Sequence, residues 1–216
     1  MKTPRMTSLW QRSAALAALL VWLAATAIAA AAPTPADLNP QDRRSLQQIG
    51  AYLNSIHTLT ATFQQHAGSG VSTGHVWLQR PGKMRFEYDR PNPVSLFADG
   101  FYVYYWDKDL HQISKIGLKA TPAWFLLRDP VTFDDVIVTG VEHGPNTIRV
   151  SVVESAKPDA GSLTMVFTEN PLLLRQWTVV DQEGKVTTVS LSDLQSGMAI
   201  DPKVFVFEDP YAARER

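Results

Sequence analysis

The sequence of 216 residues contains no cysteine. Without cysteine the protein forms neither a disulfide nor a thiolate metal site, so its hydrophobic core must stabilise it unaided. An excess of either charge is also lacking, since 20 Lys and Arg residues nearly balance 21 Asp and Glu residues. This balance gives no electrostatic case for nucleic acid or an anionic membrane as the main partner.

Charged residues are missing from one long stretch, Ser13 to Ala32. A basic segment precedes it, with Lys2, Arg5 and Arg12. The stretch ends in small residues that fit an A-x-A cleavage site, either Ala27-Ile28-Ala29 or Ala29-Ala30-Ala31. This pattern predicts a signal peptide over residues 1–31. A membrane anchor is the alternative, because the stretch is nearly long enough to span a bilayer.

Cleavage of the signal peptide changes the formal net charge from −1 to −4, because residues 1–31 carry three basic and no acidic residues. No cysteine follows the apolar run, which excludes attachment of lipid to a new N-terminal cysteine. We therefore expect a soluble periplasmic protein. Residues 32–216 are enough for one domain with its own core, and no linker or internal repeat divides them.

Helical spacing of apolar residues appears at the start of this domain. Asn39-Pro40 is typical of a helix N-terminus, and Asp42 would lie near the positive end of the helix dipole. The apolar residues that follow at helical spacing are Leu46, Ile49, Leu53 and Ile56. They predict a helix of about 15 residues with one buried stripe.

Beyond this helix the apolar pattern alternates with a period of two. Asp99-Gly100 between two such runs is a strong hairpin signal. The strand candidates are Thr58–Phe63, a segment with His75 and Trp77, Lys83–Tyr88, Val94–Ala98, Phe101–Trp106, Val136–Val141, Thr147–Val153, Leu163–Phe167, Leu173–Val180, Val186–Leu194 and Val204–Phe207. About ten strands joined by short turns predict one large antiparallel sheet.

One segment interrupts the strands. Thr121-Pro122 begins a second helix, Ala123–Leu127 is apolar, and Asp129-Pro130 ends it. A short apolar helix at this place would plug an open end of the sheet or cover a cavity.

Catalytic and metal-binding patterns are lacking. The five histidines are His57, His66, His75, His111 and His143, and none shares metal-ligand spacing with another on one element. There is no G-x-S-x-G motif and no phosphate-binding glycine loop. The carboxylate pairs Asp134-Asp135 and Asp107/Asp109 fall in predicted turns. We expect no enzyme activity, no cofactor and no metal.

The segment Phe101–Trp106 carries large apolar side chains on both faces, whereas a half-solvated strand alternates apolar and polar residues. Either both faces are covered, as in an ordinary central strand, or one faces an interior. The predicted helix at Pro40–Ser55 could cover one face, and the other would then line the interior of a curved sheet.

At this point a family resemblance appears. The segment Gly74–Tyr88 follows the pattern G-x-h-x-h-x-R-P-x-x-h-x-h, where h is apolar. It resembles the core of the periplasmic outer-membrane lipoprotein carriers, the LolA family. The order of further matches is similar along the chain: Thr58–Gln64 with Thr-Ala-x-Phe-x-Gln, Pro91, Ala98-Asp99-Gly100, Gln112 and Thr121–Arg128.

The resemblance implies a mainly β protein with α-helices: a single curved antiparallel sheet, an open half-barrel of about ten or eleven strands, covered by an N-terminal helix and a short lid helix. Its apolar cavity would hold acyl chains of lipoproteins, received from an inner-membrane ABC transporter and delivered to an outer-membrane acceptor. The protein would act as a monomer. Our candidate acyl-binding residues are Trp77, Met84, Phe86, Phe97, Phe101, Trp124, Phe125 and Leu126. Arg80 would be the latch that closes the lid.

The sequence also allows other functions. The chain could carry another lipid or a glycolipid, or it could be a periplasmic lipid-sensing regulator of the same fold. An enzyme acting on lipid or cell-wall material should show a nucleophile or paired carboxylates, which we do not find.

Overall fold

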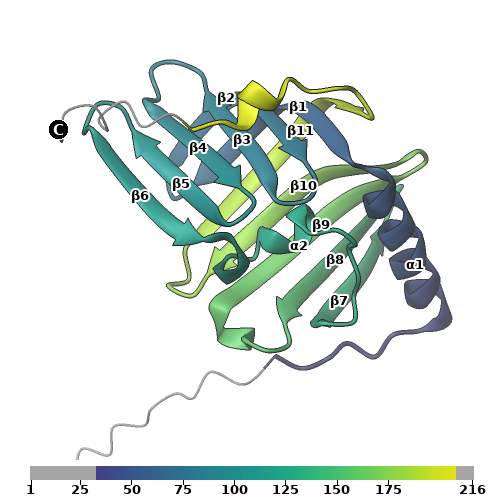
Figure 1. Cartoon of the computed structure of the whole chain (residues 1–216). Coiled ribbons are helices and arrows are strands. Elements are labelled where there is room, and N and C mark those ends of the chain that lie inside the picture. Colours follow the sequence, from purple (N-terminus) through teal and green to yellow (C-terminus); the bar gives the residue numbers. More distant parts are fainter. Residues whose placement is uncertain (1–32, 208–216) are drawn as a thin grey trace, which may run out of the picture. The chain divides into compact units, whose positions relative to one another are not determined.

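The computed structural model describes residues 33–207, so the predicted signal peptide lies outside the described residues. The strands form one open antiparallel sheet in the order β6-β5-β4-β3-β2-β1-β11-β10-β9-β8-β7 (Figure 1). Two meanders, β1–β6 and β7–β11, are thus joined where β1 pairs with β11. The predicted half-barrel with an N-terminal helix is confirmed.

The strands of the first meander are β1 (Thr58–Ala67), β2 (Gly70–Gln79), β3 (Lys83–Tyr88), β4 (Val94–Asp99), β5 (Tyr102–Asp107) and β6 (Gln112–Gly117). Those of the second are β7 (Val136–Gly144), β8 (Thr147–Glu154), β9 (Gly161–Glu169), β10 (Leu172–Asp181) and β11 (Val186–Ser196). Strand β6 is absent from our predictions, because Ile113 and Ile116 lie three apart and do not give a period of two.

Helix α1 (Pro40–Ser55) begins as its sequence predicts. The Asn39 side chain accepts hydrogen bonds from the amides of Gln41 at 2.7 Å and Asp42 at 3.0 Å. The Asp42 carboxylate in turn accepts one from the Asn39 amide at 2.9 Å, which completes a capping box. The predicted apolar stripe is buried: Leu46, Ile49, Leu53 and, just after the helix, Ile56.

Helix α1 packs on the half of the sheet that contains β8–β10 (Figure 1). The Tyr52 ring meets Phe167 of β9 edge-on with 6.1 Å between ring centres, and the Leu174 amide of β10 donates to the Tyr52 hydroxyl at 3.0 Å. Our expectation that this helix covers Phe101–Trp106 is wrong, because β5 lies beside the opposite edge of the sheet.

The segment between β6 and β7 contains a 3₁₀ turn, η1 (Leu118–Ala120), and helix α2 (Trp124–Leu127). Helix α2 is shorter than the predicted one, since the amides of Phe125 and Leu126 bond back three residues and only Arg128 bonds back four. A further 3₁₀ turn, η2 (Pro158–Ala160), precedes β9.

The strand predicted at Val204–Phe207 is wrong. Pro202–Phe205 forms a 3₁₀ turn, η3, because the Asp201 carboxylate caps its start by accepting from the Lys203 amide at 2.9 Å. Arg85 of β3 then donates to the Val204 carbonyl at 3.1 Å. This end of the described chain therefore crosses the sheet instead of extending it.

Candidate functional site

Cross-strand pairing shows which side chains share a face, because directly opposed residues of antiparallel strands project to the same side. Val76 pairs with Phe86 and Phe86 with Leu96, while Leu78 pairs with Met84. All five side chains line one cavity of about 230 Å³. We call this side of the sheet the inner face and the opposite side the outer face.

The cavity wall is almost entirely apolar. Strands of both meanders contribute, together with the end of α1 and the lid segment; the further apolar residues of the wall are Leu53, Ile56, Leu59, Ala123, Leu126, Leu127, Leu174, Trp177, Val179 and Val189. Among its few polar groups, the Tyr88 hydroxyl donates to the Gln65 side chain at 2.9 Å. Burial raises the pKa of Tyr88 to about 12, so its hydroxyl stays neutral at physiological pH. Such a wall suits an uncharged, apolar ligand.

Helix α2 forms one wall of the cavity, and we call it the lid. Leu126 and Leu127 of this helix face the cavity, and the Gly82 amide donates to the Leu127 carbonyl at 2.8 Å. Gly82 has a φ of +77°, and a Cβ there would lie 2.6 Å from the Gly100 Cα. Glycine is therefore required where the β2–β3 turn supports the lid.

Arg80 holds the lid to α1. Its Nε donates to the Leu126 carbonyl at 2.8 Å, and its Nη1 donates to the Leu53 carbonyl in the last turn of α1. The Leu53 carbonyl also accepts from the Ile56 amide at 3.2 Å, so Arg80 is its second donor. The guanidinium thus joins a carbonyl from the end of each helix through one side chain. Burial lowers the pKa of Arg80 to about 10, while Asp129 and Tyr52 act to raise it. The side chain is thus protonated at neutral pH.

The segment that follows the lid is fixed by two further side chains. The buried Arg128 guanidinium binds the Asp135 carboxylate and the Thr132 carbonyl. Asn54 of α1 donates to the Val131 carbonyl at 2.9 Å and accepts from the Val131 amide at 2.8 Å. The C-terminal end of the lid and the loop after it are therefore bonded to Arg80, Gly82 and Asn54, which are distant in sequence.

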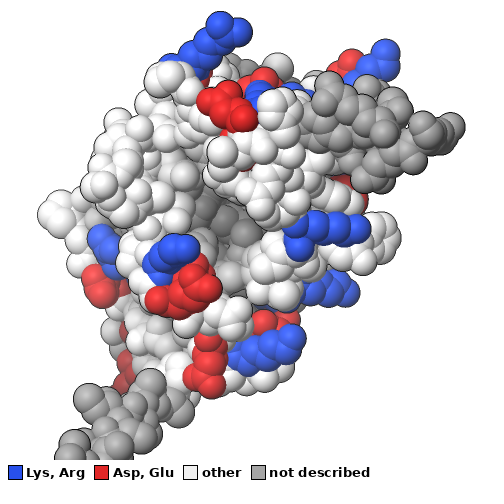
Figure 2. All heavy atoms as spheres, turned by 90° about the vertical axis from the view of Figure 1, so that its left-hand side faces the viewer, with Lys and Arg blue, Asp and Glu red and all other residues white. Residues whose placement is uncertain are grey.

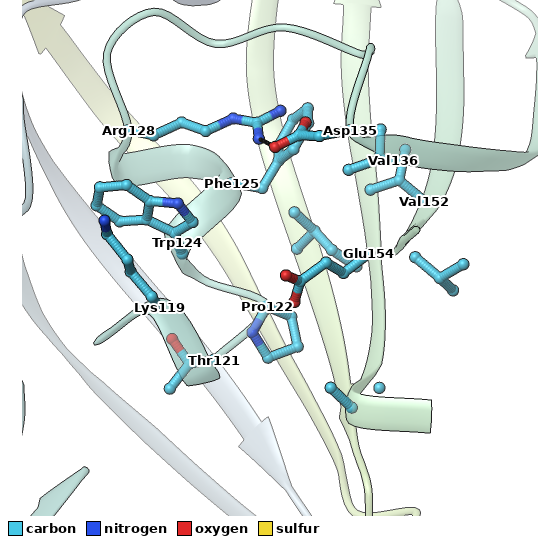
Figure 3. Close-up of a pocket in the computed structure, with 14 residues that line it drawn as sticks. Lys119, Thr121, Pro122, Trp124, Phe125, Arg128, Asp135, Val136, Val152 and Glu154 are labelled. Carbon is cyan, nitrogen blue, oxygen red and sulfur yellow. Dashed lines mark hydrogen bonds and ion pairs between the residues drawn. The ribbon is translucent and has the colours of Figure 1, made fainter. Parts of the chain in front are cut away.

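A second pocket, of about 130 Å³, lies on the other side of the lid (Figure 3). Trp124 and Phe125 of α2 face this pocket, opposite Val136 and Val152 of the sheet. Its lining also includes charged residues, among them Glu154. One turn of helix thus separates an apolar cavity from a more polar pocket.

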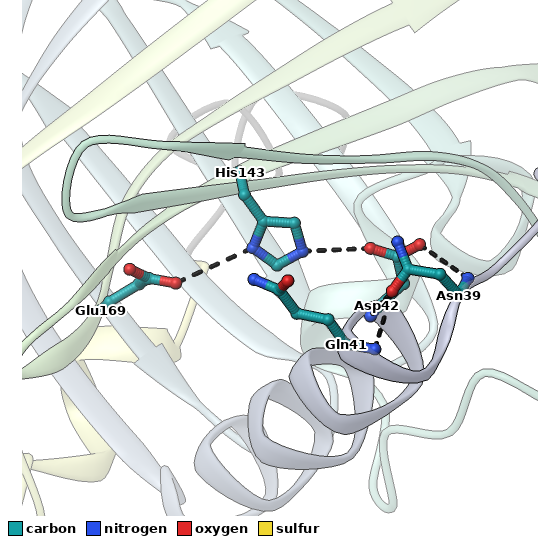
Figure 4. Close-up of polar contacts among 5 residues, drawn as sticks. All are labelled: Asn39, Gln41, Asp42, His143 and Glu169. Atoms are coloured by element: carbon teal, nitrogen blue, oxygen red, sulfur yellow. Dashed lines mark hydrogen bonds and ion pairs between the residues drawn. The ribbon is translucent and has the colours of Figure 1, made fainter.

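The N-terminal end of α1 is tied to the second meander through His143 of β7 (Figure 4). Its Nε2 lies 3.0 Å from an Asp42 carboxylate oxygen, and its Nδ1 lies 3.8 Å from a Glu169 oxygen. Asp42 therefore joins the capping box of α1 to the sheet.

Three of our candidate acyl-binding residues, Met84, Phe86 and Leu126, lie on the cavity wall. Trp124 and Phe125 face the second pocket instead. Their position differs from our expectation because successive residues of a helix point in different directions.

Trp77, Phe97 and Phe101 do not line this cavity. Phe97 pairs with Arg85, and so does Trp77, which places both on the outer face. Phe97 packs there against Phe207 with 5.2 Å between ring centres, and Trp77 stacks on His75 at 6.0 Å. Phe101 lies in the β4–β5 turn and is 78% exposed.

Sequence reasoning missed Leu174 and Trp177, which both face the cavity although they are three residues apart. A β-bulge between Leu174 and Gln176 shifts the register of β10 against β9. An extra residue in one strand reverses the alternation beyond it. No signal in the sequence marks this bulge, whereas the apolar character of both residues was visible.

Within residues 33–207, no group of three or more His, Cys, Asp or Glu residues is placed to hold a metal ion. In the same part of the chain no helix has the length and apolar character needed to cross a membrane. The carboxylate pair Asp107/Asp109, noted in the sequence, lies at a turn, as predicted. The Asp107 carboxylate accepts hydrogen bonds from the Asp109 and Leu110 amides at 3.0 Å, which is ordinary turn chemistry.

Comparison with known proteins agrees with this geometry. Residues 54–208 match the family described as "Outer membrane lipoprotein carrier protein LolA". A protein of Legionella pneumophila (strain Corby) named outer-membrane lipoprotein carrier protein is 30% identical to this chain over 176 residues, which cover 77% of this chain and 86% of the relative. A protein of the same name from Methylococcus capsulatus is 30% identical over 190 residues, which cover 81% of this chain and 86% of the relative. One from Pseudomonas aeruginosa (strain UCBPP-PA14) is 29% identical over 179 residues, covering 78% and 86%. Because the family model matches most of the chain and these relatives share about 30% of its residues, the chain belongs to the LolA family of outer-membrane lipoprotein carrier proteins.

Proposed function

We propose that the protein binds the acyl chains of lipoproteins in the inner cavity and carries them through the periplasm to the outer membrane. It would receive them from an inner-membrane ABC transporter and deliver them to an acceptor or directly to the membrane. The observation that carries this proposal is the apolar cavity, closed by a lid that the buried Arg80 joins to α1. The predicted signal peptide supports the periplasmic location.

Acyl chains have a large free-energy cost in water, so a lipoprotein needs a carrier to cross the periplasm. Each buried CH₂ is worth roughly 0.8 kcal/mol, so exposing a ~16-carbon chain to water costs on the order of 10 kcal/mol. The proposed carriage forms and breaks no covalent bond, which agrees with the absence of a catalytic motif from the sequence.

The lid would set the strength of binding. An incoming chain would displace Leu126 and Leu127 and break the two hydrogen bonds from Arg80. Hydrogen bonds to charged groups contribute about 1.5–3 kcal/mol each, so their loss offsets part of the gain from apolar burial. Binding would thus remain reversible enough for release to an acceptor.

The nature of the cargo is tested by purifying the protein from its own periplasm and identifying bound molecules by mass spectrometry. Acylated lipoproteins are the expected result. Free lipids or glycolipids alone would identify a carrier of another lipid, and the absence of any acylated molecule would contradict the proposal and favour a regulator of the same fold.

The latch is tested with Arg80→Leu, which keeps an aliphatic side chain and removes the donors. We expect an open lid, tighter cargo binding and blocked delivery in an assay that scores uptake from inner membrane and transfer to outer membrane separately. The control is Arg149→Leu, since Arg149 is exposed and has only a loose ion pair with Glu142 at 3.6 Å. Transfer by Arg80→Leu at the rate of the unmodified protein would rule out the latch.

A further inference from the structure

The inner face continues beyond the cavity toward the β6 edge. The row that contains Phe86 and Leu96 extends to Tyr105 of β5, and the row that contains Met84 extends through Ala98 and Val103 to Ile116 of β6. We call Leu96, Val103, Tyr105 and Ile116 the access strip. Leu96 itself lines the cavity, so the strip and the cavity wall form one continuous apolar surface.

The outer part of the strip lies open to solvent. Tyr105 is 44% exposed and Ile116 is 48% exposed, and no element among residues 33–207 covers them. Figure 2 views the molecule from the left of Figure 1, where β6 lies; this face is hollowed near its centre, and mostly uncharged residues surround the hollow.

The distribution of charge on these strands is unusual for an exposed edge. Edge strands commonly carry lysine or other charges that prevent unwanted contacts. Here Lys115 points to the outer face, where its Nζ lies 3.6 Å from the centre of the Tyr102 ring. The inner face of the same strand presents Ser114 and Ile116. Lys115 is thus kept off the face that leads into the cavity. Asp107, at the end of β5, lies on that face, and its carboxylate accepts hydrogen bonds from the Asp109 and Leu110 amides within its turn.

The volume of the cavity indicates what covers the strip. An apolar cavity of roughly 150 Å³ holds a six-carbon benzene molecule. On that scale the closed cavity, at about 230 Å³, accommodates roughly nine carbons, which is little more than half of a ~16-carbon acyl chain. The remaining carbons need apolar surface next to the cavity.

We propose that the access strip is an extension of the acyl-binding site, on which the outer half of a long chain lies and over which the chain enters and leaves. This inference rests on the proposed function. It assigns Tyr105 and Ile116 to ligand binding, and it assigns the β6 edge as the side from which cargo is exchanged.

The test compares a palmitoyl peptide of sixteen carbons with an octanoyl peptide of eight, using the double variant Tyr105→Asp/Ile116→Asp. We expect the dissociation constant for the palmitoyl peptide to rise by roughly tenfold or more, the loss expected when about two methylenes return to water. The octanoyl peptide, which the cavity holds alone, should bind with a change of less than about twofold. Tyr102→Asp is the matched control, because Tyr102 is 41% exposed on the outer face of the same strand.

Each outcome decides a different point. If the unmodified protein binds neither peptide, the proposed function itself fails. If it binds both and the double variant binds the palmitoyl peptide unchanged, the access strip is wrong; equal losses for both peptides would also contradict it, because the substitutions would then act on the cavity. Circular dichroism checks the fold, and Tyr105→Ser/Ile116→Ser replaces the double variant if the aspartates prevent folding.

Discussion

The two ends of the inner face differ in how they are covered. On the half that contains β8–β10, helix α1 seals the sheet, and Ile49, Leu53, Met165 and Phe167 are at most 1% exposed. On the β4–β6 half, Tyr105 and Ile116 remain almost half exposed although they continue the same apolar surface. The sealed half supplies the core that a protein without disulfides needs, whereas the open half is where we propose that the ligand lies. The lid with Arg80 lies between them.

The difference between the two halves predicts that removing an aromatic ring from the sealed half destabilises the protein far more than removing one from the open half. Phe167→Ala removes a fully buried ring and should lower the free energy of unfolding by about 3–5 kcal/mol. Tyr105→Ala, on the open half, should lower it by less than about 1 kcal/mol. Urea unfolding of both variants measures the difference, and similar losses would contradict the distinction between the halves.

A smaller effect is expected at the junction of α1 and the lid segment. Asn54→Ala leaves the Val131 amide and carbonyl without their partners and should cost about 1–3 kcal/mol. Amide hydrogen exchange should accelerate at Val131. Asn92→Ala is a comparison on the open half, where Asn92 accepts from the Val94 amide at 2.9 Å within an external turn. Exchange at Val131 that matches the unmodified protein would show that Asn54 does not hold the loop.

The cap of α1 contributes less. Asn39→Ala removes the acceptor for two amides at the start of the helix and should reduce stability by about 1 kcal/mol. Asn39→Asp keeps an acceptor and should restore most of this loss. Thermal unfolding of the two variants checks the prediction, and equal destabilisation by Ala and Asp would mean that the cap is not the cause.

No effect of pH is expected from Arg80 near neutrality. Because burial lowers its pKa only to about 10, Arg80 is protonated in both the folded and the unfolded protein below about pH 9. The difference in unfolding free energy between the unmodified protein and Arg80→Leu should therefore be constant from pH 6 to 8. Between about pH 10 and 12.5 the unfolded chain binds the proton more readily, so the contribution of Arg80 to stability should rise with pH. A difference that changes between pH 6 and 8 would place another titrating group at the latch.

Some residues that line the cavity could be identified from the sequence, and those that were misplaced or missed have identifiable physical causes. Met84, Phe86 and Leu126, to which local alternation and the apolar lid segment pointed, lie on the cavity wall, and their contact with acyl chains stays a prediction. Phe97 was placed on the wrong face because its orientation depends on pairing with Arg85 across the sheet. Trp177 was missed because a bulge in β10 reverses the alternation that would locate it.

Features that depend on neighbouring residues could be predicted from the sequence alone. Asn39, Pro40 and Asp42 start α1 through bonds that span two or three positions, and the period-two segments form strands wherever their alternation is regular. Which half of the inner face is sealed, and which groups Arg80 binds, depend on contacts between distant parts of the chain and became visible only in the folded structure. Its two acceptors are the carbonyls of Leu53 and Leu126, 27 and 46 positions away. Every residue has such a carbonyl, so nothing in the sequence distinguishes these two until the sheet brings the ends of both helices to the same side chain.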